Sequence, residues 1–365
     1  MNALSLWLMH VSALTLQETR QIIRDKSAIL LGVFMPVMLI VLFGYGISFD
    51  VRNIRLGVVD AVGTAQTERI TASLSANKTF RTTVFASRSE ANKALENFEV
   101  EALAVFEKKN AGTVSRQILV DGIDAPRATM IVNAVSGAVG IAMAGESEGA
   151  GITAVPRIWF NESAISTWYL VPGLFVIVLT LTGCMMTSLV IAREWERGTM
   201  EAMIATPASP SAILASKTIP YFCLGMLGWL LCMGAAYFIY EVPIRGGFGI
   251  ILASSALYLL VGLGLGLVIS GVTRSQFLAS QITVLASFLP AVILSGFIFD
   301  LRSAPAWADA MAHCLPPVYY LEVLKVGFLT GGMQELVFKN MVILALFAAA
   351  AFAASYRLCQ KRLRK

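Results

Sequence analysis

The sequence has little of the chemistry that most metal and disulfide sites require. It contains two histidines and five cysteines in 365 residues, and no two cysteines form a CxxC pair or a Cys/His cluster. Such spacings are the usual signs of zinc sites and of disulfide frameworks. The sequence therefore indicates neither a bound metal nor a fold that depends on disulfides.

A nucleotide-binding loop is also missing. No lysine directly follows a glycine, so the GK[ST] core of a phosphate-binding loop cannot be written from this sequence. Gly262, Gly264 and Gly266 form a GxGxG run, but the run lies inside an apolar stretch without a strand–turn–helix pattern. The GxxxG spacing of Gly262 and Gly266 is typical of closely packed helices, and we interpret it in that way. No GxSxG or other nucleophile motif is present.

Charge is scarce as well. Charged residues make up 14% of the chain and hydrophobic residues 57%, whereas soluble domains contain about 25% charged residues. The composition predicts a polytopic α-helical membrane protein. The net charge of +5 does not indicate a nucleic-acid partner, because the bases form no stripe outside the flanks of the apolar runs.

Six apolar runs are long enough, at roughly 20 residues each, to cross a bilayer as helices. None of them contains a charged residue, and they cover 28–48, 168–192, 218–240, 248–271, 277–299 and 341–356. A seventh stretch, at about 311–330, is fairly apolar but carries Glu322 and Lys325. We predict that this stretch is a re-entrant or partly inserted segment.

The absence of charge from the runs limits the possible functions. A charge at the bilayer centre costs about 2.5–3.5 kcal/mol, so a membrane protein that keeps one usually needs it. Proton-coupled carriers generally keep acids or histidines there. The sequence therefore argues against a proton-coupled carrier. A carrier coupled to sodium, bound by carbonyl and hydroxyl oxygens, stays open.

Lysine and arginine predict the orientation. They are enriched at 20–26, 193–217 and 357–365, which become cytoplasmic if both termini are inside. We expect residues 1–27 to form a cytoplasmic interfacial helix, because Leu4, Trp7, Leu8 and Val11 follow helical spacing. This segment does not have the pattern of a cleaved signal peptide. Residues 357–365 would be a basic cytoplasmic tail.

The connection between the first two runs, 49–167, has the composition of a soluble domain. We predict an α/β domain, on the periplasmic side, inserted between transmembrane helices 1 and 2. Strands are expected at 54–59, 80–85, 102–106 and 114–120, helices at 65–76, 89–98 and 126–144, and an extended segment at 157–160.

The connection 193–217 is a charged island between two uncharged runs of the larger 168–356 region. Gly198 is expected to break the preceding helix, Thr199 to cap a short new helix, and Thr206-Pro207 to end it. Ser209-Pro210 offers an N-cap with proline at the first helical position. A short helix held in this way could receive force from a soluble partner. The alternative is an ordinary interfacial loop with snorkelling charges.

The chain resembles the permease subunits of type 2 ABC exporters, specifically the bacterial multidrug-efflux-like subfamily with a large periplasmic domain. The most specific match is the series from Glu194 to Glu201, continued by Thr206-Pro207 and Lys217. Val171-Pro172-Gly173 and Leu315-Pro316-Pro317, with Tyr319 and Glu322, add support, as does Trp159-Phe160-Asn161. The family commonly has proline after that asparagine, whereas this chain has Glu162, which puts in doubt only the local turn.

The resemblance implies a half-transporter of the bacterial inner membrane, with no ATPase site of its own. Two permeases would pair above a dimer of cytoplasmic ABC ATPase subunits, which would carry ATP and Mg²⁺. Homologous systems often add a periplasmic adaptor and an outer-membrane channel. The resemblance assigns ATPase coupling to Glu194, Glu196, Arg197, Gly198, Thr199, Glu201, Thr206, Pro207 and Lys217. It suggests a translocation path near Gln281, Phe288, Pro290 and Phe297.

Two other functions stay open on the sequence alone. The inserted domain could make the chain a membrane-anchored sensor or scaffold that binds a periplasmic ligand, although six spans are more than an anchor requires. An ion-coupled carrier is the third possibility. The cargo is not specified, since spans rich in Phe, Leu, Gly and Met suit drugs, lipids and lipid-linked molecules equally.

Overall fold

The computed structural model describes residues 3–46, 54–77, 79–97, 99–108, 114–120, 125–144, 166–200, 205–297, 301 and 304–363. The chain divides into two compact units. Met1–Ser48 and Ser166–Lys365 form a helical unit, and Phe49–Ile165 form the unit inserted into it.

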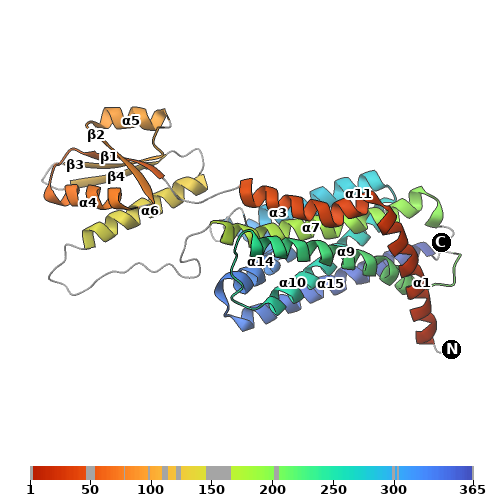
Figure 1. The fold of residues 1–365 in the computed structure, drawn as a ribbon. Helices are drawn as coiled ribbons and strands as arrows, with labels where there is room; N and C mark the ends of the chain where they lie inside the picture. The colour runs from red at the N-terminus through yellow and green to blue at the C-terminus, as the bar shows by residue number, and fades with distance from the viewer. Residues whose placement is uncertain are drawn as a thin grey trace. The chain divides into compact units, whose positions relative to one another are not determined.

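The helical unit consists of long helices, three of which contain or adjoin a π-helical turn (η) (Figure 1). Its elements are α1 (Ala3–Arg24), α2 (Lys26–Ile29), η1 (Leu30–Phe34), α3 (Met35–Gly46), α7 (Ser166–Glu196), α9 (Pro210–Phe238), α10 (Phe248–Thr273), α11 (Gln276–Thr283), η2 (Val284–Phe288), α12 (Leu289–Leu294), α13 (Ala306–His313), α14 (Pro316–Lys325), η4 (Val326–Thr330) and α15 (Gln334–Leu363).

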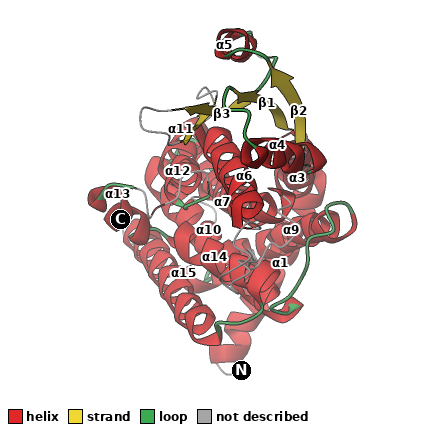
Figure 2. Cartoon of the chain, turned by 90° about the vertical axis from the view of Figure 1, so that its left-hand side faces the viewer, coloured by secondary structure: helices red, strands yellow, loops and turns green. Residues whose placement is uncertain are grey.

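Six helical stretches within the described ranges are long and apolar enough to cross a membrane, as the hydropathy pattern predicts. The second and fourth, in α7 and α10, are the most buried, with 78% and 61% of their apolar windows inside the unit, against 17% for the fifth. Figure 2 accordingly shows α7 and α10 surrounded by the other helices. The spans are Lys26–Gly44, Thr167–Glu196, Pro210–Phe238, Phe248–Thr273, Gln276–Leu294 and Gln334–Cys359.

Glycine allows α7 and α10 to pack closely. A Cβ atom on Gly262 would lie 3.4 Å from the Cα of Gly183, and one on Gly266 would lie 2.2 Å from the Thr187 hydroxyl. The Thr187 hydroxyl in turn donates to the carbonyl of Leu263 at 2.8 Å. These contacts confirm that the GxxxG spacing serves helix packing.

The last span is longer than its apolar run. The hydropathy pattern predicts 341–356, but α15 begins at Gln334 and ends at Leu363. On the N-terminal side of the run, Asn340 is buried and donates to Glu322 of α14 at 2.7 Å, so a polar residue that a hydropathy window leaves out is satisfied inside the helix. Residues 311–330 are mainly helical in α13, α14 and η4, and their re-entry into a membrane stays a prediction.

The inserted unit is an α/β fold. Its sheet contains β1 (Ile54–Asp60), β2 (Phe80–Phe85), β3 (Ala102–Lys108) and β4 (Val114–Val120) in the order β2-β1-β3-β4. β1 pairs in parallel with β2 and β3, and β4 pairs antiparallel with β3. The helices are α4 (Ala65–Ala76), α5 (Arg88–Glu96) and α6 (Ala125–Ala144).

The two faces of this sheet carry separate cores. Ile54, Leu56 and Val58 of β1 pack with apolar residues of α4 and α6, whereas Val59 and Leu103 pack with alanines of α5. All four strands and three helices expected from the sequence are present, with bounds that differ by at most two residues. The extended segment expected at 157–160 lies outside the described residues, and the periplasmic side of this unit stays a prediction.

Candidate coupling site

The connection after α7 begins with a sharp change of direction. α7 ends at Glu196, and Gly198 has φ +71°, a conformation that costs glycine little because it has no Cβ atom. Ser209 then caps α9 by accepting a hydrogen bond from the Ala212 amide at 3.3 Å, with Pro210 at the first helical position. The break and the cap are confirmed at the residues that the sequence indicates.

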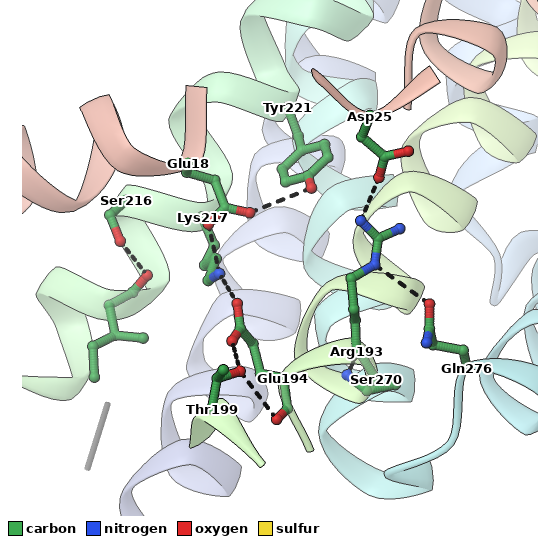
Figure 3. A network of polar contacts seen from close by, with 12 residues as sticks. Glu18, Asp25, Arg193, Glu194, Thr199, Ser216, Lys217, Tyr221, Ser270 and Gln276 are labelled. Carbon is green, nitrogen blue, oxygen red and sulfur yellow. Dashed lines mark hydrogen bonds and ion pairs between the residues drawn. The ribbon is translucent and has the colours of Figure 1, made fainter. Parts of the chain in front are cut away.

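Lys217 of α9 lies inside a cluster of acids from two other helices (Figure 3). Its Nζ atom is 2.5 Å from Oε2 of Glu18 in α1 and 2.7 Å from Oε1 of Glu194 in α7. The Lys217 side chain is only 6% exposed. A buried ammonium is tolerated only when it is paired and hydrogen-bonded, and here two carboxylates compensate it. One side chain thus joins α1, α7 and α9.

Two further hydroxyls complete this cluster. Tyr221, one turn after Lys217, donates to Oε1 of Glu18 at 3.3 Å. The Thr199 hydroxyl hydrogen-bonds to Glu194, both to its carboxylate and to its backbone carbonyl. Thr199 was expected to cap the new helix, and the structure corrects this: Thr199 is already helical, and its hydroxyl points back to α7.

A second polar cluster is centred on Arg193, the residue directly before Glu194. Arg193 of α7 pairs with Asp25, the N-cap of α2, and donates from Nε to the Gln276 side chain of α11 at 3.3 Å. Burial alone would raise the pKa of the Asp25 carboxyl, but the hydrogen bond and the charge of Arg193 outweigh burial and lower this pKa below its usual value. The Asp25 carboxyl is therefore ionised near neutral pH.

Glu196 connects the end of α7 to the start of α11. Its carboxylate accepts a hydrogen bond from the Gln276 backbone amide at 2.7 Å and another from the Gln276 side chain. Nearby, the Arg274 guanidinium lies 4.6 Å from the centre of the Trp195 ring, a cation–π contact. The end of α7 is therefore fixed to α2, α9 and α11, and through Lys217 of α9 to α1.

The structure divides the predicted coupling residues into two groups. Glu194, Glu196 and Lys217 bind other helices of the same unit, whereas Arg197, Gly198, Thr206 and Pro207 are exposed. The sequence pattern treated all of them as one docking surface. Glu201 lies outside the described residues.

The predicted path residues do not form one site. Gln281 is exposed on α11, Phe288 and Pro290 are half-buried around η2 and α12, and Phe297 is buried beyond the end of α12. Gln281 and Phe297 are separated by 16 positions along this span, or roughly 24 Å if helical throughout. Pro290 borders a small pocket with Thr180, Tyr258 and Ser287.

Phe297 contacts the start of the second span. Its ring stacks on Tyr169 with centroids 6.4 Å apart, and its carbonyl accepts a hydrogen bond from the Tyr169 hydroxyl at 3.1 Å. The ring also covers Gly173, where an added Cβ atom would meet the Phe297 ring at 1.8 Å. Gly173 of the Val-Pro-Gly series is thus required for close packing.

The sequence motifs did not indicate four residues of this site: Glu18, Asp25, Tyr221 and Gln276. A usable signal existed for Glu18, because Val11, Glu18 and Ile22 share one face of α1 and all three are buried. An acid in line with two apolar residues indicates a buried partner for its charge. No local signal marks Gln276, whose two partners come from α7.

The fold and the site define a multi-pass helical membrane protein whose helices are joined by buried charges beside one connection. Residues 26–357 match the family described as ABC-2 family transporter protein. The chain belongs to this family, which confirms the resemblance drawn from its motifs.

Several permeases are similar in sequence to this chain over about half of its length or more. It is 36% identical to the probable multidrug ABC transporter permease YbhS of Escherichia coli K12, over 97% of both chains. It is 21% identical to the probable multidrug ABC transporter permease YbhR of the same strain, over 95% of this chain and 97% of that one. The inner membrane transport permease YhhJ of that strain is 23% identical over about half of each chain.

Proposed function

We propose that the chain is the permease half of an ATP-driven exporter, with both termini and the connection 193–217 on the cytoplasmic side. Family membership supports this proposal, as do the names of the relatives, which are permeases of ABC transporters. The sequence contains no GK[ST] core for binding nucleotide phosphates. The energy for transport then comes from a separate ATPase.

The observation that carries the proposal is the pairing of Lys217 with both Glu18 and Glu194. Movement of the connection after α7 would act on α1 and α9 through this lysine. It would act on α2 and α11 through Arg193, Glu196 and Gln276. A force applied at one connection thereby reaches four neighbouring elements without a charge inside the apolar parts of the spans.

We assign two roles to the coupling residues. The exposed Arg197, Gly198, Thr206 and Pro207, together with Glu201, would contact the ATPase. Glu194, Glu196 and Lys217, with Thr199, would transmit its movement to the helices. This division follows from the contacts described above: Glu196 and Thr199 are exposed too, but both hydrogen-bond to other parts of the unit.

The proposed assembly contains two ATPase subunits, which hold ATP and Mg²⁺, and two permeases in the bacterial inner membrane. The unit 49–165 would lie in the periplasm. A periplasmic adaptor and an outer-membrane channel remain predictions from the resemblance. Purification of the tagged chain from its native membrane, with identification of the co-eluting proteins, tests each of these partners.

We propose amphiphilic molecules, drugs or lipid-like compounds, as the cargo. Two relatives are named as probable multidrug permeases, and the interior of the helical unit is mostly aromatic and aliphatic. The path would run along the fifth span past Gln281, Phe288, Pro290 and Phe297. The low burial of this span leaves it free to face a second permease.

Reconstituted vesicles provide the test. With the co-purified ATPase and Mg·ATP, we expect movement of a fluorescent amphiphile that stops when ATP is replaced by a non-hydrolysable analogue. Transport by the chain alone without nucleotide would contradict the proposal. Transport that survives ATP depletion but stops with an ionophore would establish the carrier alternative, and an assembly without an ATPase would favour the sensor.

A further inference from the structure

The fifth span is not a continuous α-helix. Between α11 and α12 lies η2, where the Leu289 amide donates to the carbonyl of Val284, five positions earlier instead of the usual four. Pro290 follows directly and has no amide proton for the carbonyl of Ala286. A π-turn and a proline are both causes of helix bending. The hydrogen-bond ladder of this span is therefore interrupted between α11 and α12.

Little packing holds η2 in place. None of its five residues is buried, and only 17% of the apolar window of the span lies inside the unit. A pocket of about 40 Å³ beside η2 is lined by Ser287, by Pro290 and by Gly262 of α10, which has no side chain. A water molecule needs roughly 10–15 Å³, so this pocket is larger than the voids usual in protein interiors. A change of bend at η2 therefore has space in which to occur.

The two sides of η2 are attached to opposite ends of α7. Gln276, the first residue of α11, binds Glu196 and Arg193 at the last turns of α7. Beyond α12, the Phe297 ring stacks on Tyr169 in the first turn of α7. A displacement of the last turns of α7 would therefore act on α11 before it reaches α12.

The first span has the same arrangement. In η1 the Met35 amide donates to the carbonyl of Leu30, five positions earlier, and Pro36 follows. This span also begins at a partner of Arg193, because Asp25 caps α2. The sixth span is as exposed as the first, yet α15 contains no proline and no π-turn along its described length. The π-turn followed by proline thus occurs in the two spans whose first residues contact Arg193.

We infer that η2 is a hinge about which α11 swings relative to α12, so that movement at the coupling site changes the bend of the fifth span. α11 has eight residues and is about 12 Å long. A change of bend of about 20° would displace its first turn by roughly 4 Å. In the proposed exporter this motion would move Gln281 relative to Pro290 along the path. That consequence rests on the proposed function, whereas the hinge rests on the fold.

Distances between spin labels in the purified full-length chain, reconstituted in lipid nanodiscs, test the hinge without an ATPase. One label replaces either Phe277 in α11 or Ile293 in α12, and the other replaces Leu346 in α15. All three side chains are exposed. The exposed Cys223 and Cys314 are first replaced by serine. The first pair of labels reports on α11 and the second pair reports on α12.

Release of α11 from α7 allows the motion to be seen. Glu196→Ala with Gln276→Ala removes the side chains that tie the two helices. We expect the Phe277–Leu346 distance distribution to broaden by about 3–4 Å, while the Ile293–Leu346 distribution stays unchanged. Equal broadening of both distributions, or no broadening of the first, would overturn the inference, because α11 would then not move about η2.

A straightened span provides the comparison. Deletion of the exposed Leu285 together with Pro290→Ala removes the extra residue of the π-turn and returns the missing amide proton, so that α11 and α12 join as one α-helix. Added to the released variant, these changes should restore the narrow Phe277–Leu346 distribution, and undiminished broadening would overturn the inference. Circular dichroism verifies folding. If the deletion variant does not fold, Ser287→Val, which fills the pocket beside η2, should narrow the same distribution.

The assembled exporter gives a second readout. Without the release, the straightened variant should retain ATP hydrolysis but move at least fivefold less cargo per ATP, and an unchanged ratio would overturn the role of the hinge in coupling. Pro220→Ala, which removes a proline from regular α9, should change neither the distance distributions nor this ratio. Failure of the unmodified assembly to transport would contradict the proposed function, but the distances in the chain alone would still decide the hinge.

Discussion

The Nζ atom of Lys217 in α9 lies 2.7 Å from Oε1 of Glu194 in α7, although 23 positions separate the two residues. The same ammonium contacts Glu18, which is 199 positions away. A pair of this kind adds little net stability, because the cost of burying the charges nearly offsets their attraction. Removing only one partner costs far more, because it leaves a charge uncompensated inside the protein.

Lys217→Ala should lower the free energy of unfolding by about 3–5 kcal/mol, because it leaves the buried Glu18 carboxylate and the partly buried Glu194 carboxylate uncompensated. Titration with SDS in mixed micelles measures the change. Lys339→Ala, at an exposed base of α15, should change stability by less than about 0.5 kcal/mol. The triple variant Lys217→Met, Glu18→Gln, Glu194→Gln should recover most of the loss. Wild-type stability of Lys217→Ala would show that the pairing does not form.

Glu194→Gln should separate ATP hydrolysis from transport in the assembled exporter. The amide keeps the size of the side chain but removes the charge that pairs with Lys217. We expect the ATPase rate to be largely retained while cargo moved per ATP falls at least fivefold, the lower range of a coupling free energy. Parallel assays of phosphate release and vesicle transport measure the ratio. An unchanged ratio of transport to hydrolysis would contradict the role of Glu194 in transmitting ATPase movement to the helices.

Arg197→Glu tests the exposed residues that we assign to contact with the ATPase. Arg197 is exposed, so its reversal should leave the permease folded but weaken binding of the ATPase through repulsion or loss of a contact. Recovery of the ATPase in affinity purification should fall by about fivefold or more. The matched variant Arg24→Glu reverses an exposed base of α1 and should have no such effect. Glu201→Lys provides the same test within the predicted short helix.

Gly173→Ala should destabilise the helical unit by about 1–3 kcal/mol, because the new methyl group overlaps the Phe297 ring. Gly234→Ala in α9 is the control, since nothing lies within 4 Å of its added Cβ atom. That variant should be neutral or stabilising by up to roughly 1 kcal/mol. In a double-mutant cycle, Phe297→Leu should offset part of the Gly173→Ala loss. Additive effects would show that the two residues do not interact.

Asp60 should make the inserted unit sensitive to acid. Burial raises the pKa of its carboxyl, but hydrogen bonds from the Thr67 side chain and from the Gly63 and Val62 amides outweigh burial and lower it. A lowered pKa in the folded state gives stability that is present above the unfolded value of about 3.9 and is lost as the pH falls through the folded value.

Hydrogen exchange in β1 and α4 of the full chain should therefore accelerate as the pH is lowered below about 4, after correction for intrinsic exchange. Asp60→Asn should remove most of this dependence, because its amide has no charge to lose. Glu68→Gln, at an exposed acid of α4, should keep it. The same acid response in Asp60→Asn as in the unmodified chain would contradict the assignment.

The elements of the inserted unit could be predicted because their signals are local. β1 alternates between the two cores at Val58 and Val59, and Thr64 precedes α4 as part of a capping box. Both patterns are set within a few residues. The N-terminal extension of α15 could not be predicted, because the burial of Asn340 depends on Glu322 of another helix.

The candidate site was predicted only in part for the same reason. The motif located the connection, its break at Gly198 and its cap at Ser209. It could not tell which charges turn inward, because the partners of Lys217 and Arg193 lie as far as 199 and 168 positions away. Charge composition is the same whether a carboxylate meets water or a lysine on a neighbouring helix.

The contact between Glu18 and Lys217 also has a practical consequence. The first 24 residues precede the first span, so they are an obvious segment to trim for better expression or to replace with a fusion partner. Trimming them would strip the bundle of one of two counter-ions for an inaccessible amine. Truncated versions should therefore retain residue 18, and affinity tags are better placed elsewhere.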